Sequence, residues 1–333
     1  MTNLKKLLLN KFVNFLEHPK VRNKIVNLCK PTRKINLENI ANPYFSVKPE
    51  VNNEHMSEAV FITGRFRSGS TLLWNIFRNI DKCSAYYEPF NERRWFDQAK
   101  RGGQIDSSHL GVTDYWSEYN ELHQLGRVYK QHWIDSDLYM DESSWDPAME
   151  EYVDILIRAD QNKTALQFNR IDFRLPWFKH HFPRNKIIHI YRNPRDQWVS
   201  FLRDPGLMNK NTVLHTYEDG FYLDPWCHDL SKNFPFLSQE LTHHPYARFY
   251  YLWKLSYLAG QQYSDISISF EDLVLKPRQT LKDIFDKINW ANVDIDELLP
   301  LIESPQLGKW RKYADADWFE LFESECERNI ELF

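Results

Sequence analysis

The sequence of 333 residues lacks the patterns that define several large protein classes. It has no apolar run of about 18 residues or more, so we expect no membrane-spanning helix. Its four cysteines lie far apart and form no Cys-x-x-Cys pair, which favours free thiols over a disulfide framework or a zinc site. The N-terminus lacks the apolar core and cleavage site of a secretory signal. Together these absences favour a cytoplasmic protein.

Metal-ligand patterns are also missing. The twelve histidines include the doublets His180-His181 and His243-His244, but neither doublet has a partner at metal-ligand spacing. We therefore expect no metal. Aromatic residues, by contrast, make up 15% of the chain, and we interpret them chiefly as a large aromatic core.

Charge is distributed unevenly along the chain. Residues 1–35 carry nine Lys and Arg and a single acid, Glu17, which gives this segment a charge of +8 and leaves −12 for the rest. Its apolar residues recur at helical spacing. A basic amphipathic helix can lie on an anionic membrane surface, or it can dock on the protein body with its lysines in solvent. Prolines and asparagines between residues 39 and 57 indicate a linker, so we divide the chain into a segment 1–57 and a domain 58–333.

The most informative stretch runs from Ala59 to Leu73. A short apolar run ends at Gly64, a polar loop follows, and from Thr71 apolar residues recur along one helix face. The spacing Gly64-x-x-x-x-Gly69-x-Thr71 matches a phosphate-binding loop, except that Ser70 replaces its lysine. In such a loop, backbone N–H groups and the helix dipole point at an anion.

Two arginines in the loop, Arg65 and Arg67, can supply the missing cation. The alternative is a tight strand-to-helix turn that binds nothing. Only ten glycines occur in the whole chain and two of them are here, which favours the binding loop.

A second strand is predicted from Cys83, ending at Glu88-Pro89, because proline stops a strand. Ligands of parallel α/β sheets lie outside the carboxyl ends of the strands, so Glu88 is expected beside the phosphate loop. A carboxylate is an unusual neighbour for a bound polyanion unless it moves a proton. Alternatively, Glu88 forms a surface salt bridge with Arg93 or Arg94.

A third strand, Lys186 to Tyr191, ends at Arg192, and Asn193-Pro194 then turns into a helix that carries Ser200. A nucleoside triphosphatase usually has an aspartate near this point to hold magnesium. Arginine indicates a second anion instead, although an arginine that caps the sheet edge is the alternative.

The remaining elements alternate between strand and helix, which predicts an α/β fold with a parallel sheet. Residues 97–145 and 204–245 show no clear periodicity, and we interpret them as a lid and as acceptor-side walls. The basic segment Gly308-Lys309-Trp310-Arg311-Lys312 either closes over a phosphate or lies in solvent. Further helices are expected over 147–160, 174–182, 248–262 and 277–288, and further strands over 164–169 and 265–270.

Two of these motifs together resemble the cofactor signatures of sulfotransferases that use 3′-phosphoadenosine 5′-phosphosulfate (PAPS). They are Arg67-Ser68-Gly69-Ser70-Thr71-Leu72-Leu73 and the segment from Tyr191-Arg192 to Ser200. The resemblance extends over about residues 58–313 and implies a three-layer P-loop-like α/β fold, in which a central parallel β-sheet is flanked by helices. It also implies that PAPS is the sulfuryl donor and that 3′,5′-bisphosphoadenosine (PAP) is the product.

The resemblance also implies roles for individual residues. The first motif, Arg67, Ser68, Gly69, Ser70, Thr71 and Leu72, would hold the 5′-phosphosulfate, with Arg67 as its cation. Arg192 and Ser200 would hold the 3′-phosphate, and Lys309 and Arg311 belong to a segment similar to the family's C-terminal basic segment.

The candidate base is a carboxylate. Many cytosolic members of the family carry a Lys-x-His pair near the second motif, but the comparable Gln167-Phe168-Asn169-Arg170 has no histidine. Tyr87-Glu88-Pro89 resembles the Glu-Pro form of the carbohydrate-type branches. This favours Glu88 as the base and leaves Asp172 as the second candidate.

The expected reaction is sulfuryl transfer to a hydroxyl of a glycan, glycolipid or other small molecule. A P-loop kinase or triphosphatase, with Asp272 on magnesium, is the rival enzyme. A membrane-surface binding protein that uses residues 1–35 is the non-enzymatic alternative. Nucleic acid is not expected as a partner, because the body is acidic and its arginines lie in nucleotide-type motifs. The sequence indicates no oligomeric state.

Overall fold

A parallel β-sheet with strand order β2-β3-β1-β4-β5 organises the part of the chain that the structure describes. The structure is a computed structural model, and it describes residues 59–107, 109, 111–160, 163–303 and 305–333. The strands are β1 (Ala59–Thr63), β2 (Cys83–Tyr87), β3 (Lys163–Phe168), β4 (Lys186–Tyr191) and β5 (Ile266–Ser269). Every strand pairing is parallel.

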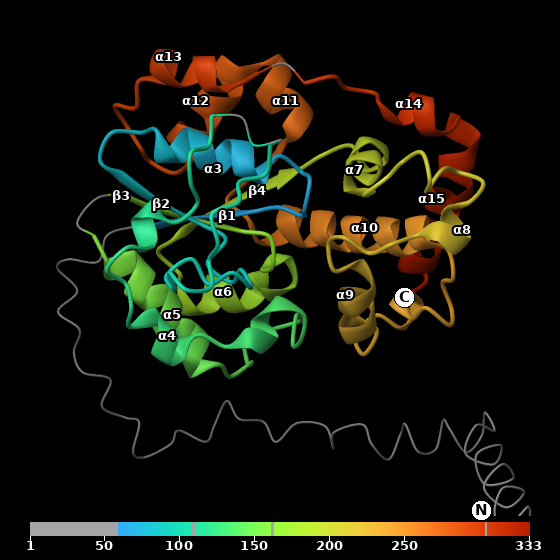
Figure 1. The fold of residues 1–333 in the computed structure, drawn as a ribbon, viewed down its shortest axis with the longest axis horizontal. Helices are drawn as coiled ribbons and strands as arrows, with labels where there is room; N and C mark the ends of the chain where they lie inside the picture. The colour runs from blue at the N-terminus through green and yellow to red at the C-terminus, as the bar shows by residue number, and fades with distance from the viewer. Residues whose placement is uncertain (1–58, 108, 110, 161–162, 304) are drawn as a thin grey trace, which may run out of the picture. The chain divides into compact units, whose positions relative to one another are not determined.

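Helices cover both faces of this sheet, as Figure 1 shows. On one face lie α3 (Ser70–Arg78), α11 (Phe270–Leu275), α12 (Pro277–Lys287) and α13 (Ile295–Leu298). On the other lie α5 (Pro147–Arg158) and α6 (Leu175–His181). The predicted three-layer α/β fold with a central parallel sheet is confirmed.

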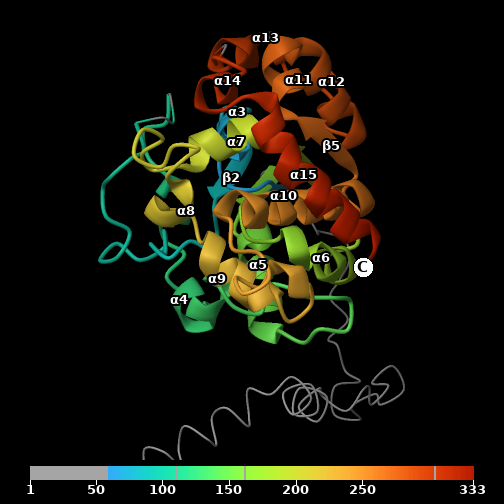
Figure 2. The ribbon, with the colours of Figure 1, turned by 90° about the vertical axis from the view of Figure 1, so that its right-hand side faces the viewer.

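The long helix α10 (Pro245–Tyr263) packs along β4 and α6. Its close approach depends on Gly260, where an added Cβ would lie 2.1 Å from Nδ1 of the buried His189 on β4. The C-terminal helix α15 (Ala316–Glu331) lies beside α10 (Figure 2). The remaining helices are α4 (Leu125–Val128), α7 (Pro194–Phe201), α8 (Val213–Thr216), α9 (Leu223–Leu230) and α14 (Trp310–Tyr313), with short 3₁₀ turns at Ser117–Tyr119, Gln131–Ile134, Asp172–Arg174, Pro235–Leu237 and Leu299–Leu301.

Several helices begin where local sequence predicts a start. The Asp146 carboxylate accepts a hydrogen bond from Met149 N at the start of α5, and Pro147 occupies the first turn. Asn193 caps α7 in the same way, ahead of Pro194. Such caps satisfy donors that have no partner within the helix.

Aromatic residues fill two apolar clusters, one around the sheet and one around α10. Their fully buried tryptophans include Trp74, Trp133, Trp177, Trp198 and Trp226. This agrees with the interpretation of the aromatic residues as core. Cys83, Cys227 and Cys326 are free thiols.

The described residues all belong to the unit Met56–Phe333. The predicted basic helix of residues 1–35 and the linker that follows lie outside the described residues, so the division at residue 57 stays a prediction. None of the described helices is both long and apolar enough to cross a membrane.

Candidate functional site

The residues that follow all five strands meet in one pocket of about 390 Å³. After β1 comes the loop with Arg67 and Gly69, and after β2 comes Glu88. The pocket residues that follow β3, β4 and β5 are Asn169, Arg170, Arg192 and Phe270. The pocket therefore lies at the carboxyl edge of the sheet, where α/β folds bind ligands.

The loop between β1 and α3 leaves the helix N-terminus open to the pocket. Gly69 is left-handed, with φ of 96°, and an added Cβ would lie 2.2 Å from the Phe270 ring, so only glycine fits. No described side chain caps α3, and its first turn holds no acid. Because the first amides of a helix have no partner within it, Ser70 to Leu72 present N–H groups and the positive end of the helix dipole to an anion.

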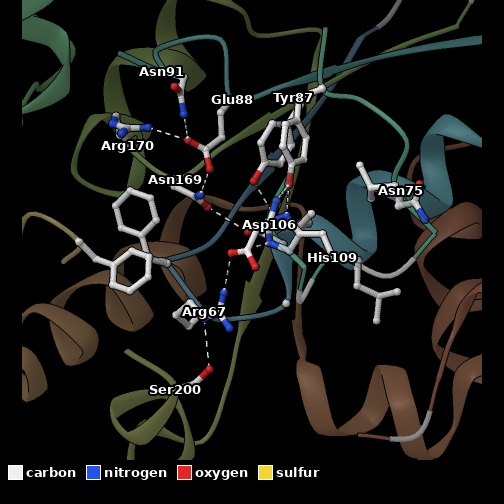
Figure 3. Close-up of a pocket in the computed structure, with 18 of the residues that line it drawn as sticks. Arg67, Asn75, Tyr87, Glu88, Asn91, Asp106, His109, Asn169, Arg170 and Ser200 are labelled. Carbon is white, nitrogen blue, oxygen red and sulfur yellow. Dashed lines mark hydrogen bonds and ion pairs between the residues drawn. The ribbon is translucent and has the colours of Figure 1, made fainter. Parts of the chain in front are cut away.

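The two motifs predicted from sequence meet in this pocket. Arg67 donates from Nε to Ser200 Oγ at 3.2 Å, and its Nη1 lies 3.5 Å from Asp106 Oδ2 (Figure 3). Arg192 Nη1 lies 3.4 Å from the Arg67 carbonyl oxygen. Residues more than 120 positions apart thus place the Arg67 guanidinium beside the Ser200 hydroxyl and the Arg192 guanidinium beside the Arg67 backbone.

Arg192 is buried, and among the described residues no carboxylate contacts its guanidinium. Its guanidinium lies 4.7 Å above the Phe270 ring, and its Nε has no hydrogen-bond acceptor among the described residues. Burial lowers the pKa of Arg192. Arg192 lines the pocket, so its guanidinium is within reach of an anion that binds there.

Glu88 forms part of the opposite wall, in a strained backbone position. Its φ is 38°, in the left-handed region that residues with side chains rarely adopt, and its side chain is buried. The carboxylate accepts hydrogen bonds from Asn169, Arg170 and Asn91 (Figure 3). The alternative of a surface salt bridge with Arg93 or Arg94 is wrong, because the ionic partner is the buried Arg170, at 2.7 Å.

Arg170 is a site residue that the motifs did not indicate. Its guanidinium bridges Glu88 and Glu92 and lies 5.2 Å from the centroid of the Phe66 ring and 5.3 Å from that of the Tyr222 ring. Burial alone would lower the pKa of Arg170, but the carboxylates of Glu88 and Glu92 raise it above its ordinary value. The available signal was its position directly after β3, at the carboxyl edge of the sheet.

Both predicted insertions contribute to the pocket wall. Residues between Gln104 and Tyr115 line it on one side, and Gly220 to Tyr222 on another. The first insertion brings His109, which the sequence reasoning also missed. Its Nδ1 lies 2.6 Å from the Tyr115 hydroxyl, and burial lowers the pKa of His109 against an opposing effect of Asp106.

Thr71 and Leu72 line the pocket with Arg67, Gly69 and Ser70, as the first motif predicts. Ser68 does not line the pocket, because its side chain is fully buried beneath the loop. Its hydroxyl has no hydrogen-bond partner among the described residues.

Other predicted residues lie apart from the pocket. Asp172 is buried against Thr63, Ser256 and Arg65 and does not line the pocket. Lys309 and Arg311 are exposed at α14, where Arg311 stacks on Trp310 instead of entering the site.

The model of the sulfotransferase family matches residues 59–294, which is more than half of the chain. The chain belongs to the sulfotransferase family. The match includes both predicted motifs and every pocket residue named above. This family assignment makes the protein a transferase.

No curated protein matches the sulfotransferase chain. Among solved structures it is similar to the sulfotransferase domain of the Synechococcus PCC 7002 olefin synthase, with 18% identity over 84% of this chain and 96% of that one and a TM-score of 0.40. It is similar to a sulfotransferase from Alicyclobacillus acidocaldarius, with 14% identity over 83% and 94% and a TM-score of 0.37. Sulfotransferase STF9 from Mycobacterium avium has 12% identity over 87% and 80% and a TM-score of 0.44. The family assignment rests on the sequence match.

Within the described residues, no group of three or more His, Cys, Asp or Glu side chains is arranged to hold a metal ion.

Proposed function

We propose that this sulfotransferase takes its sulfuryl group from PAPS and transfers it to a hydroxyl of an acceptor. The observation that carries the proposal is the meeting of Arg67, Arg192 and Ser200 beside the uncapped start of α3. Two separate anion-binding points in one pocket suit a nucleotide with a 5′-phosphosulfate and a 3′-phosphate. PAPS would supply an activated sulfuryl group, with PAP as its leaving group.

The residues present fit this donor. The amides of Gly69 to Leu72 and the Arg67 guanidinium would hold the 5′ end and the charge that develops on the leaving oxygen. The Nε of Arg192, which has no acceptor among the described residues, and the Ser200 hydroxyl would bind the 3′-phosphate. Lys309 and Arg311 are not part of the donor site that we propose, because they do not line the pocket.

Glu88 is the base in this proposal. A base must come within hydrogen-bond reach of the proton that it removes, and Glu88 lies in the pocket wall whereas Asp172 does not. The Arg170 guanidinium and the side-chain amides of Asn91 and Asn169 donate hydrogen bonds to the Glu88 carboxylate and hold it in place. Sulfuryl transfer resembles phosphoryl transfer in its loose in-line transition state, so positioning and charge stabilisation should dominate the rate.

The aromatic side chains Tyr222, Phe221, Trp95 and Tyr115 form part of the pocket's apolar surface. They suit the faces of a sugar ring or another hydroxylated ring, in keeping with a glycan, glycolipid or small-molecule acceptor. The rival kinase or triphosphatase loses support, because the Asp272 carboxylate accepts a hydrogen bond from the Ser269 hydroxyl, pairs with Lys276 and does not line the pocket.

The proposal is tested by an acceptor screen with sulfur-labelled PAPS, run on wild type and Glu88→Gln. Wild type should label an acceptor, and Glu88→Gln should slow transfer by about 10²- to 10⁴-fold. Glu118→Gln is the matched control, because Glu118 also forms an ion pair with an arginine, Arg78, but lies outside the pocket.

Two outcomes would count against the proposal. Near-normal turnover by Glu88→Gln removes Glu88 as the base. Wild-type protein that neither binds PAP nor transfers label removes PAPS as the donor.

A further inference from the structure

A hydrogen-bond chain joins the loop at the start of α3 to Glu88. Ser70 Oγ donates to Asn169 Oδ1 at 2.9 Å, and Gln167 Nε2 donates to the same oxygen at 3.0 Å. The Asn169 amide nitrogen in turn donates to Glu88 Oε1 (Figure 3). These hydrogen bonds therefore connect Ser70, at the start of α3, through Asn169, after β3, to Glu88, after β2.

The direction of the Asn169 amide is fixed by its partners. Two donors converge on Oδ1, so the opposite edge of the amide, which carries the donor Nδ2, must face Glu88. Ser70, Gln167, Asn169 and Glu88 are each at most 4% exposed. In so buried a network every lost partner is costly, and the side chains are held in one arrangement.

The two carboxylate oxygens of Glu88 are held differently. Oε2 accepts from Arg170 at 2.7 Å and from Asn91 at 2.8 Å, which uses both of its lone pairs. Oε1 accepts the Asn169 amide, and the Glu88 carboxylate also interacts with the Tyr87 side chain. The strained φ of 38° at Glu88 also indicates that the surroundings hold this carboxylate in place.

We propose that Asn169 is a positioning residue that fixes Oε1 of Glu88 as the proton-accepting atom and ties it to the donor-binding loop through Ser70. This inference rests on the proposed function. In the transfer step the acceptor oxygen forms a bond to sulfur while the bond from sulfur to the PAP oxygen breaks. The acceptor's proton passes to Oε1, and PAP leaves with the electron pair of the broken bond.

Two substitutions separate this role from simple structural support. Asn169→Ala removes both the oxygen that accepts from Ser70 and Gln167 and the amide nitrogen that donates to Glu88. Asn169→Asp keeps an oxygen for Ser70 and Gln167 but replaces the donor that faces Glu88 by a second carboxylate oxygen. Asn185→Ala is the control, because Asn185 is buried outside the pocket and its Nδ2 has no partner in the described structure.

The readout is PAP release from PAPS with two probes, phenol and the more acidic p-nitrophenol. A positioned base matters more for the weaker acid. We therefore expect Asn169→Ala to slow transfer to phenol by about 10- to 100-fold and transfer to p-nitrophenol by much less. In Asn169→Asp the two facing carboxylates oppose each other's ionisation, so the acid limb of the rate profile with phenol should move up by about one pH unit or more.

Each result decides between the roles. The inference is overturned if Asn169→Ala slows transfer to both probes by the same factor and the pH profile of Asn169→Asp is unchanged. These results would assign Asn169 a structural role. Wild type that binds PAP but transfers to neither phenol nor p-nitrophenol also overturns the inference. Phenol is small enough for the pocket, and a positioned base acts on any hydroxyl that reaches it. Wild type that does not bind PAP overturns the donor proposal itself.

Discussion

Arg192 offers the sharpest test of how the donor is held. Its guanidinium is buried, lies 4.7 Å over the Phe270 ring, and has an Nε without an acceptor in the described structure. A buried cation of this kind has already lost its hydration, so a phosphate that reaches it forms charge-assisted hydrogen bonds at little further cost. Substituting Arg192 by alanine should therefore remove affinity for the 3′-phosphate specifically.

The size of the effect follows from the kind of bond. A hydrogen bond to a charged group contributes about 1.5–3 kcal/mol, which corresponds to roughly 10- to 150-fold in affinity. Wild type should bind PAP more tightly than adenosine 5′-phosphate, which lacks the 3′-phosphate. In Arg192→Ala this preference should shrink by roughly 10- to 150-fold, and Arg192→Lys should restore part of it, since lysine keeps the charge without the fork.

Isothermal titration calorimetry with both nucleotides measures the preference directly. Arg195→Ala is the matched control, because Arg195 comes from the same segment but is held by Glu323 at 2.7 Å and does not line the pocket. Its preference for PAP should change by less than about twofold, since a distant surface charge is screened. The reasoning is refuted if Arg192→Ala keeps the full wild-type preference for PAP.

Two further predictions concern the loop and the sheet. Gly69→Ala places a Cβ 2.2 Å from the Phe270 ring at a φ of 96°; it should lower the free energy of unfolding in urea by about 1–3 kcal/mol and weaken PAP binding, and unchanged values would count against the loop geometry. Burial lowers the pKa of His189 from 6.5 to about 4. As the pH falls, the unfolded chain therefore binds a proton at this histidine before the folded chain does. The stabilisation is complete above about pH 6.5 and is lost as the pH falls toward 4, by up to about 3 kcal/mol. Urea unfolding of His189→Asn should show a smaller loss across this pH range, and an equal loss would contradict the assignment.

Local sequence was enough to predict all five strands and most of the helices that cover the sheet, but not the short helices α11 and α13. β4 follows from an apolar run before Asn193-Pro194, and α5 from the cap at Asp146. The C-terminal helix α15 was missed. Its polar face carries many acids, and its buried residues Phe319 and Cys326 pack against α10. Such a helix depends on tertiary packing more than on a local start signal.

The site could be predicted where a motif carries it and not where tertiary contact makes it. Arg67 and Ser200 lie in recognisable segments, and the structure places them in contact. Asn169 and Arg170 follow an ordinary strand and have no motif of their own. Their importance comes from partners 80 or more positions away, so only the folded arrangement reveals it.

The central claim is that the pocket binds a 3′-phosphorylated adenine nucleotide. The most direct measurement is the melting temperature of the full chain with PAP in metal-free buffer, beside ATP with magnesium. Ligand at about 100 times its dissociation constant adds about 2.7 kcal/mol to stability, which PAP should show as a clear rise in melting temperature while ATP with magnesium gives little. A rise with ATP and magnesium but not with PAP would contradict the account.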